Sequence, residues 1–239
     1  MTIALFLIIT FLGSVLQTVS GFGFGIFVQM FFPYFLPSAA FGTAVSGLMS
    51  PFNSLFGLIS VRKKVQYRVV APIIAMYMIV NVLIVLLTKD KPDDFFKKLL
   101  AVVMIVFGIY FLFFAKRIRI RPTLLASGIC GALSGVIGGL FSMGGPPLVL
   151  YYSTATDDKE TYLANIRFTF LITTTFSTVV RIVGGIITRQ MVGYSVLGLV
   201  TLIPGVLIGK RLVNRINIET LKRIIYIFMM VSGVYMLVR

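Results

Sequence analysis

Long runs of apolar residues, separated by short groups of charged residues, constrain this chain more than any other feature. Charged residues make up only 12% of the sequence, against roughly 25% in an average soluble domain. So few polar groups cannot cover a water-exposed surface, and the apolar surface must therefore face lipid. One helical span needs roughly 20 apolar residues, and the sequence predicts eight apolar segments, at about residues 3–36, 38–60, 69–88, 95–115, 122–152, 162–187, 191–209 and 220–238. We therefore expect an all-α, polytopic integral membrane protein.

The charge balance is strongly basic, with 22 Lys and Arg against 7 Asp and Glu. In a soluble protein such a balance would suggest nucleic acid as a partner. Here the basic residues stand between apolar runs, which is typical of topology signals on the cytoplasmic side of a membrane protein. The expected partners are membrane lipid and a small solute, nucleic acid is excluded, and a homo-oligomer is left open.

The two halves of the chain repeat, which predicts a first membrane repeat at 1–118 and a second at 119–239 within one membrane domain. At a shift of 125 residues, the segment that begins Lys97-Lys98 and contains Gly108 and Tyr110 falls on the segment that begins Lys222-Arg223 and contains Gly233 and Tyr235. At a shift of 121 residues, Gly21–Gly25 falls on Ser142–Pro146. Internal duplication is common in transporters, whose binding sites lie where the repeats meet.

Segments one and five are both unusually long and interrupted by glycine. Each has about 30 apolar residues, or roughly 45 Å of helix, whereas the hydrocarbon core is about 30 Å thick. Two shapes fit: a broken, tilted span, or a re-entrant hairpin of two half-helices. If both segments span, Lys and Arg divide 10 to 10 across the membrane, whereas two hairpins place 14 inside and 6 outside. The positive-inside rule favours the hairpins, and hence inverted repeats.

The acidic residues exclude several classes of function. All of them lie in loops or at segment ends, at Asp90, Asp93, Asp94, Asp157, Asp158, Glu160 and Glu219, and histidine is absent. Proton relays within membranes normally use Asp, Glu or His, and metal sites need similar ligands. An intramembrane protease of the Ser/His or paired-Asp kind would lack its base. We therefore expect no enzyme activity, no metal and no other cofactor.

The glycine-rich interruptions favour an anion site. A Gly-Pro break frees backbone N–H groups that lipid cannot satisfy, so such backbone is tolerated only where it lines a cavity or is buried in protein. Pro146 and Pro147 suit the first turn of a restarting helix, whose N-terminus attracts anions. The alternative is that glycine marks close helix packing, which is the interpretation we prefer for Gly131, Gly135 and Gly139.

Polar residues spaced by four along segment six form a second candidate. They predict one polar helix face, which Thr174 and Thr178 widen; the face consists of Asn165, Thr169, Thr173, Ser177 and Arg181. Alternatively the hydroxyls bond their own backbone, and Arg167 and Arg181 snorkel to the two interfaces. Segment two carries a weaker version of this pattern in Ser46, Ser50, Asn53 and Ser54. The predicted substrate-binding residues are Gln17, Ser20, Gly21, Gly23, Gly25, Ser142, Gly144, Gly145, Pro146, Asn165, Arg167, Thr169 and Thr173.

The two interruptions also carry a family resemblance. The run Gly138–Leu148, with Gly144-Gly145-Pro146-Pro147 at its centre, and the weaker Ser20–Gly25 resemble the motifs of the TauE/SafE family of sulfite exporters. The resemblance covers the length and the duplicated layout. It implies transport of sulfite, sulfonates or related organic and sulfur-containing anions in the cytoplasmic membrane. It places the site at Gly21, Gly23, Gly25, Gly144, Gly145 and Pro146, although Phe22 and Phe24 depart from the commonest first motif.

The sequence therefore favours a secondary transporter, an exporter of small anions that works by alternating access. The membrane potential, about 2.3 kcal/mol per charge per 100 mV, drives anions outward without a carboxylate relay. Two alternatives stay open: an anion channel with a continuous polar pore, and a structural subunit in which packing fills the interruptions.

Overall fold

The computed structural model describes residues 2–114, 120–156, 158–213 and 218–238. Within these ranges every regular element is helical, so the prediction of an all-α chain is confirmed. The helices are α1 (Thr2–Ser20), α2 (Phe24–Gln29), α3 (Phe32–Phe35), α4 (Ala39–Leu58), α5 (Tyr67–Thr88), α6 (Asp93–Ile109), α7 (Leu124–Phe141), α8 (Gly145–Ala155), α9 (Lys159–Val183), α10 (Arg189–Leu212) and α11 (Ile218–Val238). A short 3₁₀ turn, η1 (Arg62–Lys64), precedes α5, and a π-turn, η2 (Tyr110–Phe114), extends α6.

Six stretches of helix are long and apolar enough to cross a membrane: Ile3–Ser20, Tyr67–Thr88, Asp93–Phe113, Leu124–Phe141, Lys159–Val183 and Arg189–Leu212. Helix α4 is as long but richer in Ser, Gly and Asn, and it is not one of the six. Six of the eight expected segments therefore contain a helix able to span. The count of eight spans, and whether segments one and five re-enter, stay predictions.

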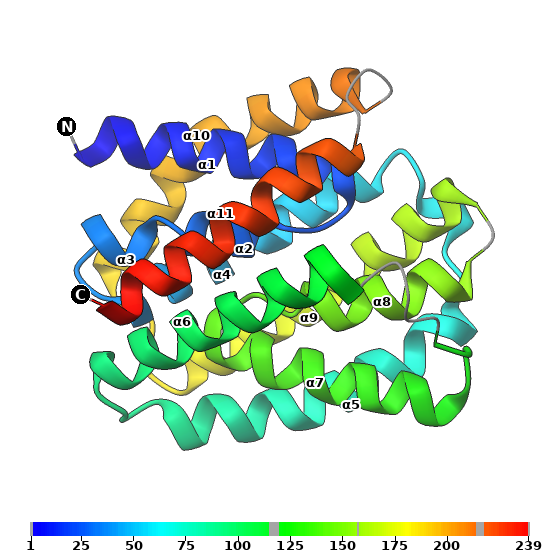
Figure 1. Cartoon of the computed structure of the whole chain (residues 1–239), viewed down its shortest axis with the longest axis horizontal. Coiled ribbons are helices and arrows are strands. Elements are labelled where there is room, and N and C mark those ends of the chain that lie inside the picture. The colour runs from blue at the N-terminus through cyan, green and yellow to red at the C-terminus, as the bar shows by residue number, and fades with distance from the viewer. Residues whose placement is uncertain (1, 115–119, 157, 214–217, 239) are drawn as a thin grey trace.

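The contacts between the helices stay the same when the helices of the first half are exchanged for those of the second half. Helix α1 packs on α10 along one edge of the molecule, and α7 packs on α5 along the opposite edge (Figure 1). Between these edges α6 packs on α11 and α4 on α9, while α10 also contacts α4 and α9 contacts α5. Replacing each helix by its counterpart in the other half leaves this set of main pairings unchanged. Such a pattern is what two structurally equivalent repeats would produce, although the boundary between 118 and 119 itself stays a prediction.

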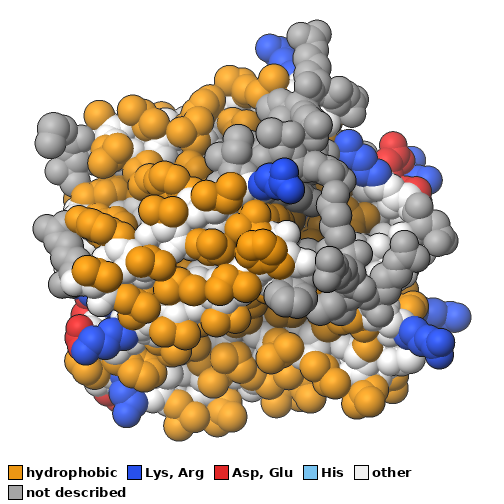
Figure 2. Space-filling view, in the orientation of Figure 1, with side chains coloured by type: hydrophobic (Ala, Val, Ile, Leu, Met, Phe, Trp, Pro, Cys, Tyr) orange, Lys and Arg blue, Asp and Glu red, His pale blue; other side chains and the backbone are white. Residues whose placement is uncertain are grey.

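The surface is apolar over most of its visible face. Figure 2 shows hydrophobic side chains across the middle of the molecule, with Lys and Arg mostly toward its ends. On α5, for example, Ile79, Leu83 and Leu87 are 68%, 56% and 63% exposed. A water-soluble protein seldom exposes so large a contiguous apolar area, and this surface fits contact with lipid.

The first turn of α9 is capped from the loop that precedes it. The Asp158 carboxylate accepts hydrogen bonds from the Thr161 hydroxyl at 2.6 Å and from the Thr161 and Glu160 N–H groups at 2.9 Å. The bonds from Thr161 are the main cause that holds the pKa of Asp158 below its usual range. This N-cap fixes where α9, the helix with the most buried polar side chains, begins.

Glycines set the close approach of the paired helices. A Cβ on Gly135 of α7 would lie 2.8 Å from the Tyr77 carbonyl oxygen of α5, and one on Gly131 would lie 2.6 Å from the Ile73 carbonyl oxygen. On the opposite edge, a Cβ on Gly205 would lie 2.8 Å from the Phe11 carbonyl oxygen. The packing interpretation of the α7 glycines is therefore confirmed.

We predict that Gly135→Ala lowers the free energy of unfolding by about 1–3 kcal/mol, because the new methyl group forces α5 and α7 apart. The control is Gly128→Ala on the same helix, where an added Cβ meets nothing within 4 Å. That substitution should leave stability unchanged or raise it by up to about 1 kcal/mol through helix propensity. Thermal unfolding in detergent measures both, and equal melting temperatures for the two variants would contradict the packing argument.

Candidate functional site

The first interruption separates α1 from α2. Helix α1 ends at Ser20, and Gly21 and Gly23 adopt positive φ angles of 85° and 106° before α2 begins at Phe24. Glycine adopts this backbone conformation without the strain that a Cβ would cause. The Ser20 hydroxyl lies 2.8 Å from the Leu16 carbonyl oxygen and 2.6 Å from that of Phe22, so it holds the turn from inside.

The second interruption separates α7 from α8 and is built differently. Helix α7 ends at Phe141, and Ser142 turns the chain with a φ of 56°. Helix α8 begins at Gly145, with Pro146 and Pro147 in its first turn. Proline has no N–H, and the N–H groups of a first turn lack intrahelical partners in any case, so the two prolines cost no helical hydrogen bond there.

The two interruptions meet inside the bundle. A Cβ added to Gly25, at the start of α2, would collide with the Ser142 carbonyl oxygen. The Ser142 hydroxyl donates to the Thr43 carbonyl oxygen at 3.1 Å, and the Gln29 side-chain amide donates to the Phe141 carbonyl oxygen at 3.1 Å. The end of α7 is thus anchored to α2 and α4 of the other half.

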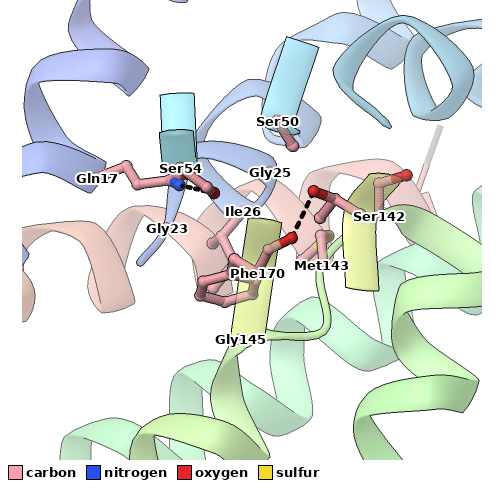
Figure 3. Close-up of a pocket in the computed structure, with 11 residues that line it drawn as sticks. Gln17, Gly23, Gly25, Ile26, Ser50, Ser54, Ser142, Met143, Gly145 and Phe170 are labelled. Atoms are coloured by element: carbon pink, nitrogen blue, oxygen red, sulfur yellow. Dashed lines mark hydrogen bonds between the residues drawn. The ribbon is translucent and has the colours of Figure 1, made fainter. Parts of the chain in front are cut away.

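A small pocket lies at this meeting point (Figure 3). Its cavity volume is about 20 Å³, which is room for about one water molecule and far below the volume of typical small-molecule sites. On one side the Gln17 amide donates to the Ser54 hydroxyl at 3.2 Å. The pocket is lined by Gln17, Gly23, Gly25, Ile26, Ser50, Ser54, Ser142, Met143, Gly145, Phe170 and Thr174.

Five predicted site residues line this pocket, namely Gln17, Gly23, Gly25, Ser142 and Gly145. The remaining residues of the two motifs support the turns from behind. Gly21 faces Leu163 of α9, and Gly144 faces the Ser134 carbonyl oxygen and the Tyr77 ring. Ser20 and Pro146 are buried but do not line the pocket.

The predicted residues of segment six do not line the pocket; most bond within the protein. Asn165 bonds to Gln66, accepting from its backbone N–H at 2.8 Å and donating to its side chain at 3.1 Å. Thr169 shares a 2.6 Å hydrogen bond with the Tyr152 hydroxyl, and Thr173 donates to the Thr169 carbonyl oxygen at 2.7 Å. The neighbouring face of α9, with Phe170 and Thr174, reaches the pocket instead.

Six lining residues were not among the predicted site residues. Ser50 and Ser54 belong to the weaker polar pattern of segment two, and Thr174 belongs to the widened face of segment six. Met143 lies within the second motif but was not predicted as a site residue, and Ile26 and Phe170 had no signal in the sequence, because an apolar residue in an apolar segment does not reveal which neighbour it faces. The pocket is therefore polar on its α1 and α4 sides and partly apolar elsewhere.

No charged side chain of the described residues lines the pocket, but two arginines are buried on α9, the helix that carries its lining residues Phe170 and Thr174. Arg167 donates to the Gly57 carbonyl oxygen at 2.8 Å and to the Thr18 carbonyl oxygen at 2.6 Å. Arg181 donates to the Gly139 carbonyl oxygen at 2.6 Å and to that of Gly138 at 3.3 Å. Each arginine is only 5% exposed, so neither snorkels to the surface.

The polar side chains of the pocket lining are the Gln17 amide and the hydroxyls of Ser50, Ser54, Ser142 and Thr174. Gly145 is the first residue of α8, an 11-residue helix whose N-terminal end carries a partial positive charge. The Gly145 N–H itself donates to the Met143 carbonyl oxygen at 2.7 Å, and Pro146 and Pro147 have no N–H. Helix α2 has only 6 residues, so its dipole is weak and it contributes chiefly backbone close to the pocket. Gln17, Ser50, Ser54 and Thr174 add side-chain groups, which suit a small solute with several acceptor oxygens.

A helical bundle with an apolar surface, in which two interrupted helices meet at an internal pocket, has the architecture of a membrane transporter. The family model described as "Sulfite exporter TauE/SafE" matches residues 5–236. The chain belongs to this family, which is a family of membrane transporters of sulfite-type anions, and the sequence resemblance is confirmed. No match was found among curated proteins or solved structures.

We predict that Gly25→Ala abolishes transport, because its Cβ would displace the Ser142 carbonyl and separate the two interruptions. Gly193→Ala on α10 is the control, since an added Cβ there meets nothing within 4 Å. Flux of labelled sulfite into proteoliposomes measures the effect, with equal amounts of inserted protein verified for each variant. Normal flux through a correctly inserted Gly25→Ala variant would show that contact between the interruptions is not needed.

Proposed function

We propose that this protein is a secondary transporter that exports a small oxyanion, sulfite or a sulfonate, across the cytoplasmic membrane by alternating access. The observation that carries the proposal is an internal pocket at which both glycine interruptions meet. A duplicated transporter is expected to bind its substrate at such a junction. Membership of the TauE/SafE family supports sulfite-type anions as the substrate class.

The chemistry of the pocket supports an anion over a cation. A cation would need carboxylates or several converging carbonyl oxygens, whereas the sequence has no Asp or Glu in residues 1–89, 95–156 or 161–218. The Gln17 amide and the Ser54 hydroxyl, which accepts from it, keep protons that can be donated to anionic oxygens. The hydroxyls of Ser50 and Thr174 donate to the Ser46 and Phe170 carbonyl oxygens and can turn to a substrate only by releasing those bonds, while the N-terminal end of α8 contributes its partial positive charge. Arg167, which was predicted as a ligand, acts in this proposal from behind the pocket.

The form of the pocket supports a transporter over a channel. Its cavity volume is about 20 Å³, so the pocket has to widen to admit an oxyanion, and Phe170, Ile26 and Met143 form apolar parts of its wall. A channel would need a continuous polar path through the bundle. The two halves of the chain make matching helix contacts and so form two similar units. Movement of one unit against the other would open the pocket to each side of the membrane in turn.

Labelled sulfite efflux from proteoliposomes tests the proposal directly. We expect saturable flux that an inside-negative potential accelerates in the outward direction, because an anion gains free energy by leaving the negative side. Flux that does not saturate would favour a channel. Absence of flux for sulfite, sulfonates and small carboxylates alike would favour a structural subunit and contradict the proposal.

Two adjacent threonines of α9 provide a matched pair for testing the pocket. Thr174 lines the pocket and Thr175 is exposed, yet each donates a 2.6 Å hydrogen bond to the carbonyl oxygen four residues earlier. We predict that Thr174→Val raises the KM for sulfite about three- to tenfold, because it removes a hydroxyl whose proton turns from the Phe170 carbonyl oxygen to the bound anion. Thr175→Val should leave KM unchanged, and an equal effect of both substitutions would place the substrate elsewhere.

A further inference from the structure

Both interrupted helices end inside the bundle, and an arginine of α9 reaches each end. The Thr18 carbonyl oxygen, in the last turn of α1, accepts from Arg167. The Gly138 and Gly139 carbonyl oxygens, in the last turn of α7, accept from Arg181. Thr18 and Gly139 are 121 residues apart, which is the same shift that relates the two glycine motifs. The two accepting helix ends are therefore equivalent positions of the two halves, although both arginines belong to α9.

The physical need for these contacts lies in the helix ends. The last four carbonyl groups of a helix have no intrahelical partner, and the end carries a partial negative charge. In lipid such carbonyls must find a donor within the protein. A guanidinium group supplies several N–H donors together with a charge of the right sign.

The arginines carry more positive charge than the carbonyls neutralise. Both are only 5% exposed, and the sequence has no acidic residue in 1–89, 95–156 or 161–218. Among the described residues, the ion pairs join Lys97 to Asp93 and Lys98 to Asp94, on a different helix. The Nε–H of Arg181 has no partner among the described residues. Buried charge without a counter-ion is costly, and a bound anion would relieve that cost.

The two charges lie on either side of the pocket. Arg167, Thr174 and Arg181 are seven residues apart along α9, a spacing that keeps them on one face of the helix. Seven residues correspond to about 10 Å of helix. Because Thr174 lines the pocket, the pocket lies beside the part of α9 that is midway between the two arginine positions along the helix axis. Its distance from each is within the range of an electrostatic interaction in a medium of low polarity.

We propose that Arg167 and Arg181 are the charge-selecting and positioning residues of the transport site. They hold the ends of α1 and α7, cancel the negative charge that those ends would direct at the pocket, and make the pocket electropositive without lining it. This inference rests on the proposed anion transport. It assigns the selection for anions to two residues outside the pocket wall and predicts that selection depends on substrate charge.

Two anions of similar shape but different charge separate this role from a purely structural one. Sulfate carries two negative charges and methanesulfonate carries one, so the loss of a distant positive charge weakens sulfate binding by the square of its effect on methanesulfonate. For Arg181→Gln we expect about a threefold loss of inhibition of sulfite flux by methanesulfonate and about a tenfold loss by sulfate. Arg181→Lys keeps the charge and should keep the wild-type ratio of the two inhibition constants, even if total flux falls.

Arg189→Gln is the matched control, because Arg189 is exposed at the start of α10 and its removal should alter neither constant. The same comparison at Arg167, with Arg167→Gln and Arg167→Lys, should give the same pattern. An equal change for both anions in the Gln variants, or a ratio that Lys fails to restore, would overturn the inference. So would a wild-type protein that transports sulfite but is inhibited by neither anion. If wild-type protein transports no anion, the proposed function itself has failed.

Discussion

The structure depends on how irregular backbone is satisfied inside an apolar bundle. Lipid offers no hydrogen bonds, so every carbonyl and N–H released by a broken helix must find a partner within the protein. At the end of α7 the partners are Gln29 and Arg181, and at the end of α1 the partner is Arg167. These contacts come from distant parts of the sequence, so the broken helices can exist only in the assembled bundle.

The same constraint explains why the pocket lies where it does. Helices α1 and α7 are held from their C-terminal ends by cations, which leaves the restarting helix α8 to direct its N-terminal end toward the junction. Gly25 allows the Ser142 carbonyl to approach more closely than any side chain would permit. The absence of acidic residues from the spans and the presence of two buried arginines both favour a negatively charged solute at the junction.

The polar face of α9 shows how a correct pattern can give an incomplete site. The period of four identified a helix with buried polar groups, and Asn165, Thr169 and Thr173 are indeed buried. Yet Asn165 binds Gln66 and Thr169 binds Tyr152, while Thr174, about one hundred degrees around the helix from Thr173, reaches the pocket. The spacing of polar residues identifies a polar face of α9 but does not say which helix or cavity that face meets. The rotation of α9 about its own axis is set by its packing against α4 and α5.

The sequence alone determined the helical membrane class, the two glycine interruptions and the absence of acidic residues from the apolar segments. These follow from composition and local backbone rules: apolar length predicts spans, and Gly, Pro and the positive φ angles at Gly21 and Gly23 belong to the residues themselves. Only the tertiary structure decided that the interruptions touch, that Ser50, Ser54 and Thr174 join the pocket, and that the arginines bind helix ends. Those contacts join residues from 42 to 149 positions apart, and their geometry depends on how the helices rotate and approach one another, which no local pattern encodes.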